Sequence, residues 1–297
     1  MTPTLSPSSP LQAGNTLPSR LSSPDSPKSS FGVDIRYVPP FLITAILIAA
    51  NTGFGVLEAL PKTLTAIGTA IVLEILLSWL INRRMPHLAS AYVSGISCGI
   101  LVRSPEWWPY IVVAAISITS KYVIRVKGRH LWNPSNLGIA VLLFLAPQSV
   151  ASLSVQWGNN LYPMLIIWVL GAVIVSRMQR LHICAVYVAS FLAFSLLRSQ
   201  LTGHTFAAEV APITGPMYQL FVFFMITDPK TTVTGRWAQA LVAFLVAAAE
   251  CALRLNQNVH APYFALFLVG PPANLIDIYV QEWRKRKKAK MDMELAG

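Results

Sequence analysis

Long apolar stretches alternate with short polar loops along most of the chain. A helix needs roughly 20 apolar residues to cross a bilayer, so this pattern predicts an all-α polytopic membrane protein. We expect ten transmembrane segments, near 38–57, 63–81, 88–102, 107–124, 136–155, 161–176, 181–197, 212–227, 237–255 and 261–280. The third and the eighth are the shortest, and polar and proline residues interrupt the tenth, namely Pro271, Pro272, Asn274 and Asp277.

The two ends of the chain differ from this apolar middle. Residues 1–36 are rich in Ser, Pro and Thr and nearly free of large apolar side chains, so we expect a disordered cytoplasmic tail. They have no basic and apolar run of the kind that marks a secretory signal. Residues 282–297 hold the run WRKRKKAK, which is typical of a polybasic cytoplasmic tail at a membrane surface.

Composition narrows the class of protein. Hydrophobic residues make up 54% of the chain and charged residues 12%, against about 25% charged in a water-soluble domain, which excludes an ordinary cytosolic enzyme. The net charge of +11 fits basic loops that face the cytoplasm and anionic lipid. We therefore expect membrane lipid as a partner and no nucleic acid. Cys98, Cys184 and Cys251 lie far apart and outside any CxxC pair, which argues against a disulfide framework or a cysteine metal site.

The positions of lysine and arginine predict the orientation. With the amino terminus in the cytoplasm, most of the 23 basic residues fall on the cytoplasmic side, and the outer side holds Lys62, Arg103, Arg198 and Arg254. This asymmetry follows the positive-inside rule. Ten spans then place both termini in the cytoplasm, and we expect a bacterial inner membrane.

The two halves of the apolar region, about 37–156 and 157–281, share a pattern. The third segment ends in Arg103-Ser104-Pro105, and the eighth ends in Thr227-Asp228-Pro229. Each is followed by a longer helix with a charge pair one turn apart, Lys121/Arg125 and Glu250/Arg254, and then by a His and a Pro. Five spans per half make the second copy inverted. Short helices at equivalent places in an inverted repeat point to a polar site at the repeat interface.

Three charged residues lie inside expected spans, Glu74, Lys121 and Glu250. Such residues are costly in a membrane and usually have a role. One interpretation is a structural tie, a carboxylate–lysine pair between the two repeats, and the other is a relay for protons or ions. The sequence lacks HExxH, GxSxG and phosphate-loop motifs, so we predict no catalytic residue and no metal ligand.

Two polar motifs flank spans. Asn133-Pro134-Ser135-Asn136 follows a basic loop, and Thr227-Asp228-Pro229 ends the eighth segment. Proline stops helical hydrogen bonding, and the neighbouring amides, hydroxyls and carboxylate either cap helix ends or face a polar ligand. Both interpretations stay open at this point.

These motifs resemble those of a known family. Residues 127–138 (KGRHLWNPSNLG) and 223–231 (FFMITDPKT) resemble motifs of the RnfD/NqrB family, and the similarity extends over roughly 37–281. The resemblance implies a membrane protein that works with the other components of an ion-translocating redox complex and binds FMN or riboflavin. Noncovalent flavin would lie near Asn133, Asn136, Thr227 and Asp228.

The family also links FMN through its phosphate to a threonine in a Ser/Thr-Gly-Ala-Thr motif. Thr202-Gly203-His204-Thr205 is the most similar run here, which would make Thr205 the attachment point. His204 replaces the family's Ala, and the interval from Thr205 to Thr227 is short. These departures fit a shortened branch of the family.

The sequence is therefore consistent with three functions. The first is a flavin-dependent electron-relay component of an ion-translocating oxidoreductase. The second is a channel or transporter for small solutes, because the inverted layout also resembles urea and ammonium channels. The third is a structural membrane component without redox activity. Fold likeness by itself does not choose among them.

Overall fold

The computed structural model describes residues 40–41, 43–45, 48, 60–152 and 161–296. The expected disorder of residues 1–36, and most of the first expected segment, therefore lie outside the described residues. All elements below belong to one unit, Arg36–Gly297. In the described ranges the chain is all-α except for four strands of two residues each.

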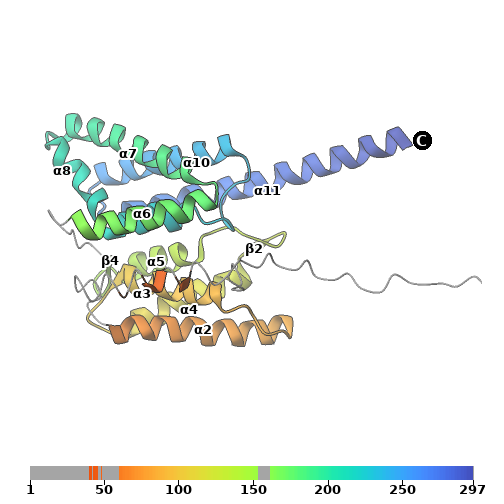
Figure 1. Ribbon diagram of the computed structural model, residues 1–297, viewed down its shortest axis with the longest axis horizontal. Helices are drawn as coiled ribbons and strands as arrows, with labels where there is room; N and C mark the ends of the chain where they lie inside the picture. The colour runs from red at the N-terminus through yellow and green to blue at the C-terminus, as the bar shows by residue number, and fades with distance from the viewer. Residues whose placement is uncertain (1–39, 42, 46–47, 49–59, 153–160, 297) are drawn as a thin grey trace, which may run out of the picture. The chain divides into compact units, whose positions relative to one another are not determined.

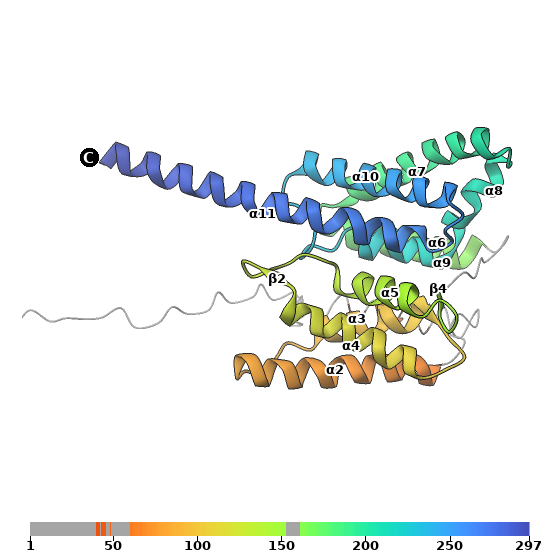
Figure 2. The ribbon, with the colours of Figure 1, turned by 180° about the vertical axis from the view of Figure 1, so that it is seen from behind.

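Helices occur in two groups (Figures 1 and 2). The first group holds α2 (Leu60–Asn82), α3 (Ala89–Leu101), α4 (Trp108–Val123) and α5 (Pro134–Leu145). The second holds α6 (Leu161–Arg177), α7 (Leu181–Thr202), α8 (Phe206–Val210), η2 (Ala211–Thr214), α9 (Pro216–Leu220), the π-helical turn η3 (Phe221–Met225), α10 (Arg236–Leu255) and α11 (Ala261–Ala296).

Every expected segment from the second to the tenth overlaps a helical element, and the eighth, 212–227, consists of the three short elements η2, α9 and η3. Four described helices, α2, α7, α10 and α11, are long and apolar enough to cross a membrane. The helices α3, α5 and α6 are apolar but shorter. The count of ten spans therefore stays a prediction.

Helix α5 is shorter than the sequence pattern predicted. It ends at Leu145, although the apolar segment was expected to continue to residue 155. Ala146, the residue before Pro147, has the non-helical angles φ −132° and ψ 51°, and a following proline disfavours the helical conformation. Beyond this point β4 (Ala151–Ser152) pairs antiparallel with β1 (Val102–Arg103), which follows α3.

Helix α11 is longer than predicted. It passes through Pro271 and Pro272 and includes the polybasic residues that we expected as a separate tail. Pro271 has no N–H to donate to the carbonyl of Phe267, four residues earlier. The indole N–H of Trp132 donates to that carbonyl at 3.1 Å. Trp132, from a loop distant in sequence, thus donates to a carbonyl that has lost its helical partner because of Pro271.

The buried face of α2 is made of small and polar residues. Thr63, Ala66, Ala70, Glu74 and Ser78 recur every three or four residues and are all buried. Large apolar side chains of the same helix are exposed, among them Leu64, Val72, Leu76 and Trp79. A water-soluble helix shows the opposite distribution, whereas small residues at helix contacts and apolar residues outside are typical of helices in lipid.

Helix α3 packs against this small-residue face without intervening side chains. Gly95 and Gly99 lie one turn apart, as in the small-xxx-small pattern of membrane helices. A Cβ atom added at Gly95 would lie 2.7 Å from the Cα of Ile67, and one at Gly99 would lie 2.9 Å from the Cα of Thr63. The two backbones can approach this closely only because both positions are glycine.

The two groups share a packing pattern. In the first, α2 packs against α4 and α4 packs against α5; in the second, α7 packs against α10 and α10 packs against α11. Between α4 and α5, β2 (Arg125–Val126) and β3 (Arg129–His130) form a hairpin. Its two turn residues, Lys127 and Gly128, both have positive φ, as a two-residue hairpin turn requires.

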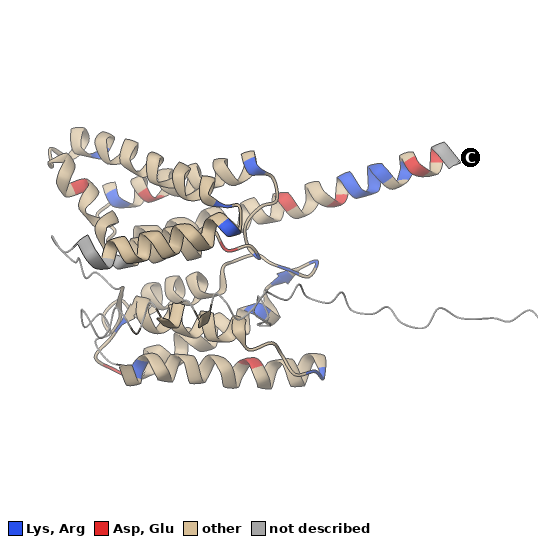
Figure 3. Cartoon of the chain, viewed as in Figure 1, with Lys and Arg blue, Asp and Glu red and all other residues tan. Residues whose placement is uncertain are grey.

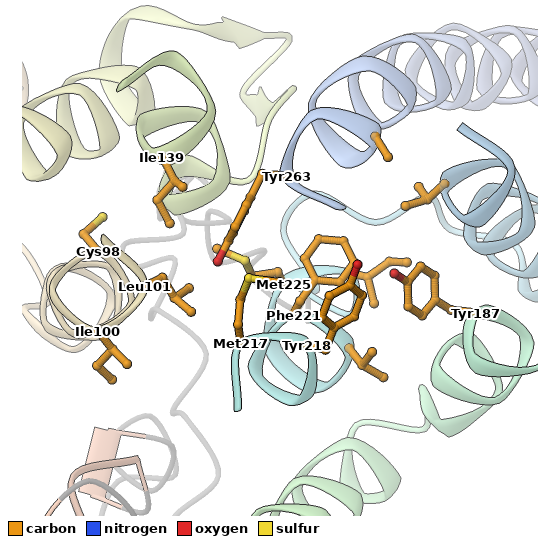
Figure 4. Packing of buried hydrophobic residues seen from close by; sticks show 14 of the residues in the cluster. Cys98, Ile100, Leu101, Ile139, Tyr187, Met217, Tyr218, Phe221, Met225 and Tyr263 are labelled. Carbon is orange, nitrogen blue, oxygen red and sulfur yellow. The ribbon is translucent and has the colours of Figure 1, made fainter. Parts of the chain in front are cut away.

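The larger of two apolar clusters in the described residues joins the groups. It contains Cys98 and Leu101 of α3, Ile139 of α5, Phe221 of η3 and Tyr263 of α11. Figure 4 shows Tyr263 beside Met217 and Met225, between side chains of α3 and α5 and those of the second group. The short helices α3, α9 and η3 thus lie where the two groups meet.

Candidate functional site

The Asn-Pro-Ser-Asn motif begins α5. Asn133 has extended angles, and its Oδ1 accepts the backbone N–H of Asn136 at 3.1 Å. Pro134 occupies the first helical position, where a missing N–H costs nothing. The expected helix cap is therefore present, and Asn133 provides it.

The Thr-Asp-Pro motif forms the turn after η3. Asp228 accepts the backbone N–H of Lys230 at 3.2 Å and the hydroxyl of Thr231 at 2.9 Å. Thr227 is buried and donates its hydroxyl to the carbonyl of Phe223. These local bonds hold the carboxylate of Asp228 in one orientation.

The two motifs meet across the two helix groups. The side-chain amide of Asn133 donates to Asp228 Oδ2 at 3.3 Å and to the carbonyl of Met225 at 3.4 Å. Asn136, which is buried, donates to the carbonyl of Tyr263 at 3.1 Å. Four of the predicted cofactor-binding residues, Asn133, Asn136, Thr227 and Asp228, therefore gather at one junction, hereafter the motif junction.

Asn274 of α11 also belongs to the motif junction, although the sequence pattern assigns it no role. Its side-chain amide donates to the carbonyls of Leu131, at 2.8 Å, and Thr231, at 2.6 Å. It is 2% exposed. The signal that would have identified it is a polar residue inside an apolar span, which we interpreted only as an interruption of the helix.

The cavity at the motif junction is small. Its volume is about 20 Å³, and its lining includes Trp132, Asn133, Met225 and Asn274. A cavity of this size admits about one water molecule, whereas sites for drug-sized ligands occupy roughly 300–1,000 Å³. A flavin ring does not fit among these residues unless the two helix groups separate.

Glu74 and Lys121 form a buried ion pair within the first group. Lys121 Nζ lies 3.3 Å from Glu74 Oε2, and the two residues are 4% and 8% exposed, Lys121 being the more buried. Tyr122 donates to Glu74 Oε1 at 2.8 Å, and Lys121 donates to the carbonyl of Ser90 at 3.2 Å. The pair joins α2 to α4, so the expectation of a carboxylate–lysine tie between the two halves is wrong.

Glu250 has its own cluster in the second group. It is fully buried, and its carboxylate accepts hydrogen bonds from the hydroxyls of Tyr187 and Tyr218 and from Arg254 Nε at 2.9 Å. Arg254 also donates to the Tyr218 hydroxyl. The sequence placed Glu250 and Arg254 one turn apart, but the two tyrosines come from other helices and gave no signal of their own.

The predicted relay residues therefore form two clusters. Glu74 and Lys121 lie in one helix group, and Glu250 lies in the other with a different cation. Each carboxylate is next to a cation and a tyrosine hydroxyl, which neutralises the charge that burial would otherwise penalise. A path for ions between the two clusters stays a prediction.

Thr205 is exposed at the start of α8, away from the motif junction. Its side chain accepts the backbone N–H of Ala208 at 3.4 Å, as a helix cap does. The neighbouring Glu209 binds Arg198 Nε at 2.7 Å and His204 Nδ1 at 3.0 Å. Burial raises the pKa of Glu209, but the hydrogen bonds from Arg198 and His204 outweigh it and hold that pKa below its ordinary value.

The basic hairpin contacts the second group through a further ion pair. Arg129 Nη1 lies 2.8 Å from Asp277 Oδ2, and Arg129 Nη2 donates to the carbonyl of Thr232 at 3.3 Å. His130, next along the hairpin, is partly buried near Arg125, Lys230 and Lys121. Burial and these cations lower the pKa of His130 to about 4, so His130 is neutral at pH 7.

Neither a family model nor a curated protein matches the chain. The resemblance to the RnfD/NqrB family therefore rests on the two motifs themselves and stays a hypothesis.

Proposed function

We propose that the chain is a membrane component of a flavin-dependent, ion-translocating electron transport complex, similar to the RnfD/NqrB family. The observation that carries the proposal is the hydrogen bond between Asn133 and Asp228. These residues belong to the two motifs of the resemblance and lie 95 positions apart. Chance similarity in two separate loops gives no reason for them to meet.

The distribution of charge supports a cytoplasmic location for both termini. In Figure 3, Lys and Arg concentrate at the end of the helices that carries the β2–β3 hairpin and the projecting part of α11. The middle of the helices is almost free of charge. Such an asymmetry is what the positive-inside rule describes for an inner membrane protein.

The contacts of the short helices support a repeat of five plus five inverted spans. The end of η3 lies against Asn133, which begins α5 of the other group. The end of α3 continues into β1, whose partner strand contains Ser152, and Ser152 Oγ lies 2.8 Å from His260 Nδ1, just before α11. The end of the third helix thus lies near the start of the fifth helix of the other half, directly for η3 and through β4 for α3.

The proposed cofactor is FMN or riboflavin. A bound flavin would supply the electron relay, and this chain would supply position and charge. At the motif junction the flavin would have to bind in an opened arrangement, because the present cavity is too small. At Thr205 the hydroxyl is exposed, so the attachment implied by the family's motif is sterically accessible.

The cavity at the motif junction is too small for a solute to pass, which argues against a solute channel at this place. Solute flux through proteoliposomes that contain only this chain would nevertheless favour the channel function. The role of Glu74, Lys121 and Glu250 in ion movement is also part of the proposal, since ionisable residues inside membrane helices commonly mark ion pathways.

The direct test is flavin content. The chain is purified from its native membrane together with the proteins that copurify, and absorbance near 450 nm and the mass of the peptide containing Thr205 are measured. We expect flavin in the complex and, for covalent FMN, an adduct that Thr205→Val removes and Thr202→Val, a change in the same peptide, retains. A complex without any flavin contradicts the redox proposal.

A further inference from the structure

An open cleft of about 460 Å³ lies where the β2–β3 hairpin, the loop before α7 and α11 come together. Its lining includes four cations, Lys127, Arg129, Arg180 and Lys285, and one carboxylate, Glu282. We refer to it as the basic cleft. It lies at the basic end of the helices seen in Figure 3.

Two of the cations in the basic cleft are neutralised within the protein. Arg129 pairs with Asp277, and Lys127 pairs with Glu282. Arg180 Nη1 is buried and has no hydrogen-bond partner among the described residues. Lys285 also lines the cleft, and Asp228 acts on Arg180 electrostatically. Four cations against Glu282 leave an excess of positive charge in the lining, which favours an anionic ligand.

An apolar groove of about 650 Å³ adjoins the basic cleft between α10 and α11. Leu241 and Leu245 line one wall, and Ile276 and Val280 line the other; all four are exposed. Along α10 the groove extends from Ala238 to Leu245, which is about 10 Å at 1.5 Å per residue.

The cleft and the groove adjoin at two residues. Thr234 and Gln281 line both, and the Gln281 amide donates to the Thr234 hydroxyl. A ligand that occupies both must therefore be anionic at one end and an extended aliphatic chain at the other. Thr234, Asp277, Gln281 and Arg284 are the polar residues of the groove lining, and its other side chains are aliphatic or proline. This lining suits a hydrocarbon chain better than a flavin ring, for which aromatic stacking would be expected.

We propose that the basic cleft and the apolar groove form one binding site for an anionic phospholipid, with the phosphate in the cleft and an acyl chain in the groove. The inference rests on the membrane location proposed above, and it is independent of the redox function. Basic pockets at the cytoplasmic ends of membrane helices are suited to such headgroups.

The test is native mass spectrometry of the full chain in detergent, titrated with phosphatidylglycerol, phosphatidylcholine or glycerol phosphate. We expect phosphatidylglycerol to bind in preference to the other two. Arg180→Gln and Lys285→Gln should each weaken its binding about fivefold, as expected for one cation at a lipid surface. Lys288→Gln, one turn further along α11 and outside the cleft, should leave it unchanged.

A second pair of variants tests the groove. Ala238 lines it, so Ala238→Trp should block the acyl chain and weaken phosphatidylglycerol without affecting glycerol phosphate. The matched change Leu76→Trp, on the exposed face of α2, should have no effect.

The proposed lipid site is contradicted if phosphatidylglycerol and phosphatidylcholine bind equally well. It is also contradicted if Lys285→Gln and Lys288→Gln weaken the binding of phosphatidylglycerol equally. Glycerol phosphate binding as tightly as the lipid would assign the cleft to a soluble anion instead.

Membrane fractionation separates the two proposals. Recovery of the chain in the soluble fraction contradicts the membrane location and the lipid site together. Recovery in the membrane fraction without a preference for phosphatidylglycerol contradicts the lipid site alone.

Discussion

Lys121 and Glu74 lie 3.3 Å apart, and both are buried. Two opposite charges compensate one another there, but either one by itself would be a buried charge without its counter-ion. Glu250 in the second group is compensated in a similar way, by Arg254 and two tyrosine hydroxyls. The helices themselves tolerate these charges only through such partners.

Lys121→Met should lower the free energy of unfolding by about 3 to 5 kcal/mol, because Glu74 is left buried without its cation. Chemical denaturation of the chain in detergent measures the loss. The double variant Glu74→Gln/Lys121→Met should be more stable than Lys121→Met. Equal stability of the single and double variants would contradict a compensating pair, and Lys290→Met in the exposed end of α11 serves as the control.

His130 predicts a pH dependence of stability. Its pKa is about 4 in the folded chain, against 6.5 for an ordinary histidine, so between these values the unfolded chain binds more protons. Stability should therefore fall as pH falls from about 6.5 to about 4. His130→Gln should make this slope shallower, as measured by thermal denaturation at a series of pH values. Burial also lowers the pKa of His260, so part of the slope should remain in His130→Gln. An unchanged slope in His130→Gln would exclude His130 as a source.

At the scale of the elements, close packing of α3 on α2 depends on glycine. A side chain at Gly99 would lie 2.9 Å from the Thr63 backbone, but one at Gly68 of α2 meets no atom within 4 Å. We expect Gly99→Leu to separate the helices and destabilise the chain, whereas Gly68→Leu should be neutral or slightly stabilising because leucine favours helix more than glycine does. Melting temperature in detergent compares the two.

The helix ends show why prediction of elements has limits. The length of the apolar stretches predicted the helices well, because it depends only on residues that are neighbours in the sequence. It placed the end of α5 too late, and it treated Pro271 and Pro272 as an interruption of α11. The proline pair is tolerated inside the helix because Trp132, remote in sequence, binds the carbonyl that Pro271 leaves free. A local pattern contains no information about such a partner.

At the scale of the whole molecule, the motif junction holds the two helix groups against one another. Asn133→Asp should weaken it, because two carboxylates would then face one another across 3.3 Å. Asp228→Asn should cost less, since the amide can still accept the N–H of Lys230. The exchange Asn133→Asp/Asp228→Asn restores one donor and one carboxylate, so its stability, measured by chemical denaturation in detergent, should exceed that of Asn133→Asp. A double variant at least as unstable as the two single effects combined would show that these residues act independently.

The apolar helices, the basic end of the bundle and the two polar motifs could be predicted from the amino-acid sequence, because these features depend on residue type and on neighbours within a few positions. Which side chains meet depends on how the helices pack. Lys121 binds Glu74 instead of Glu250, and Asn133 binds Asp228, because helix packing brings together side chains 47 and 95 positions apart. The same packing placed a basic cleft beside an apolar groove, and neither the charges nor the leucines could indicate that the two adjoin from their places in the chain.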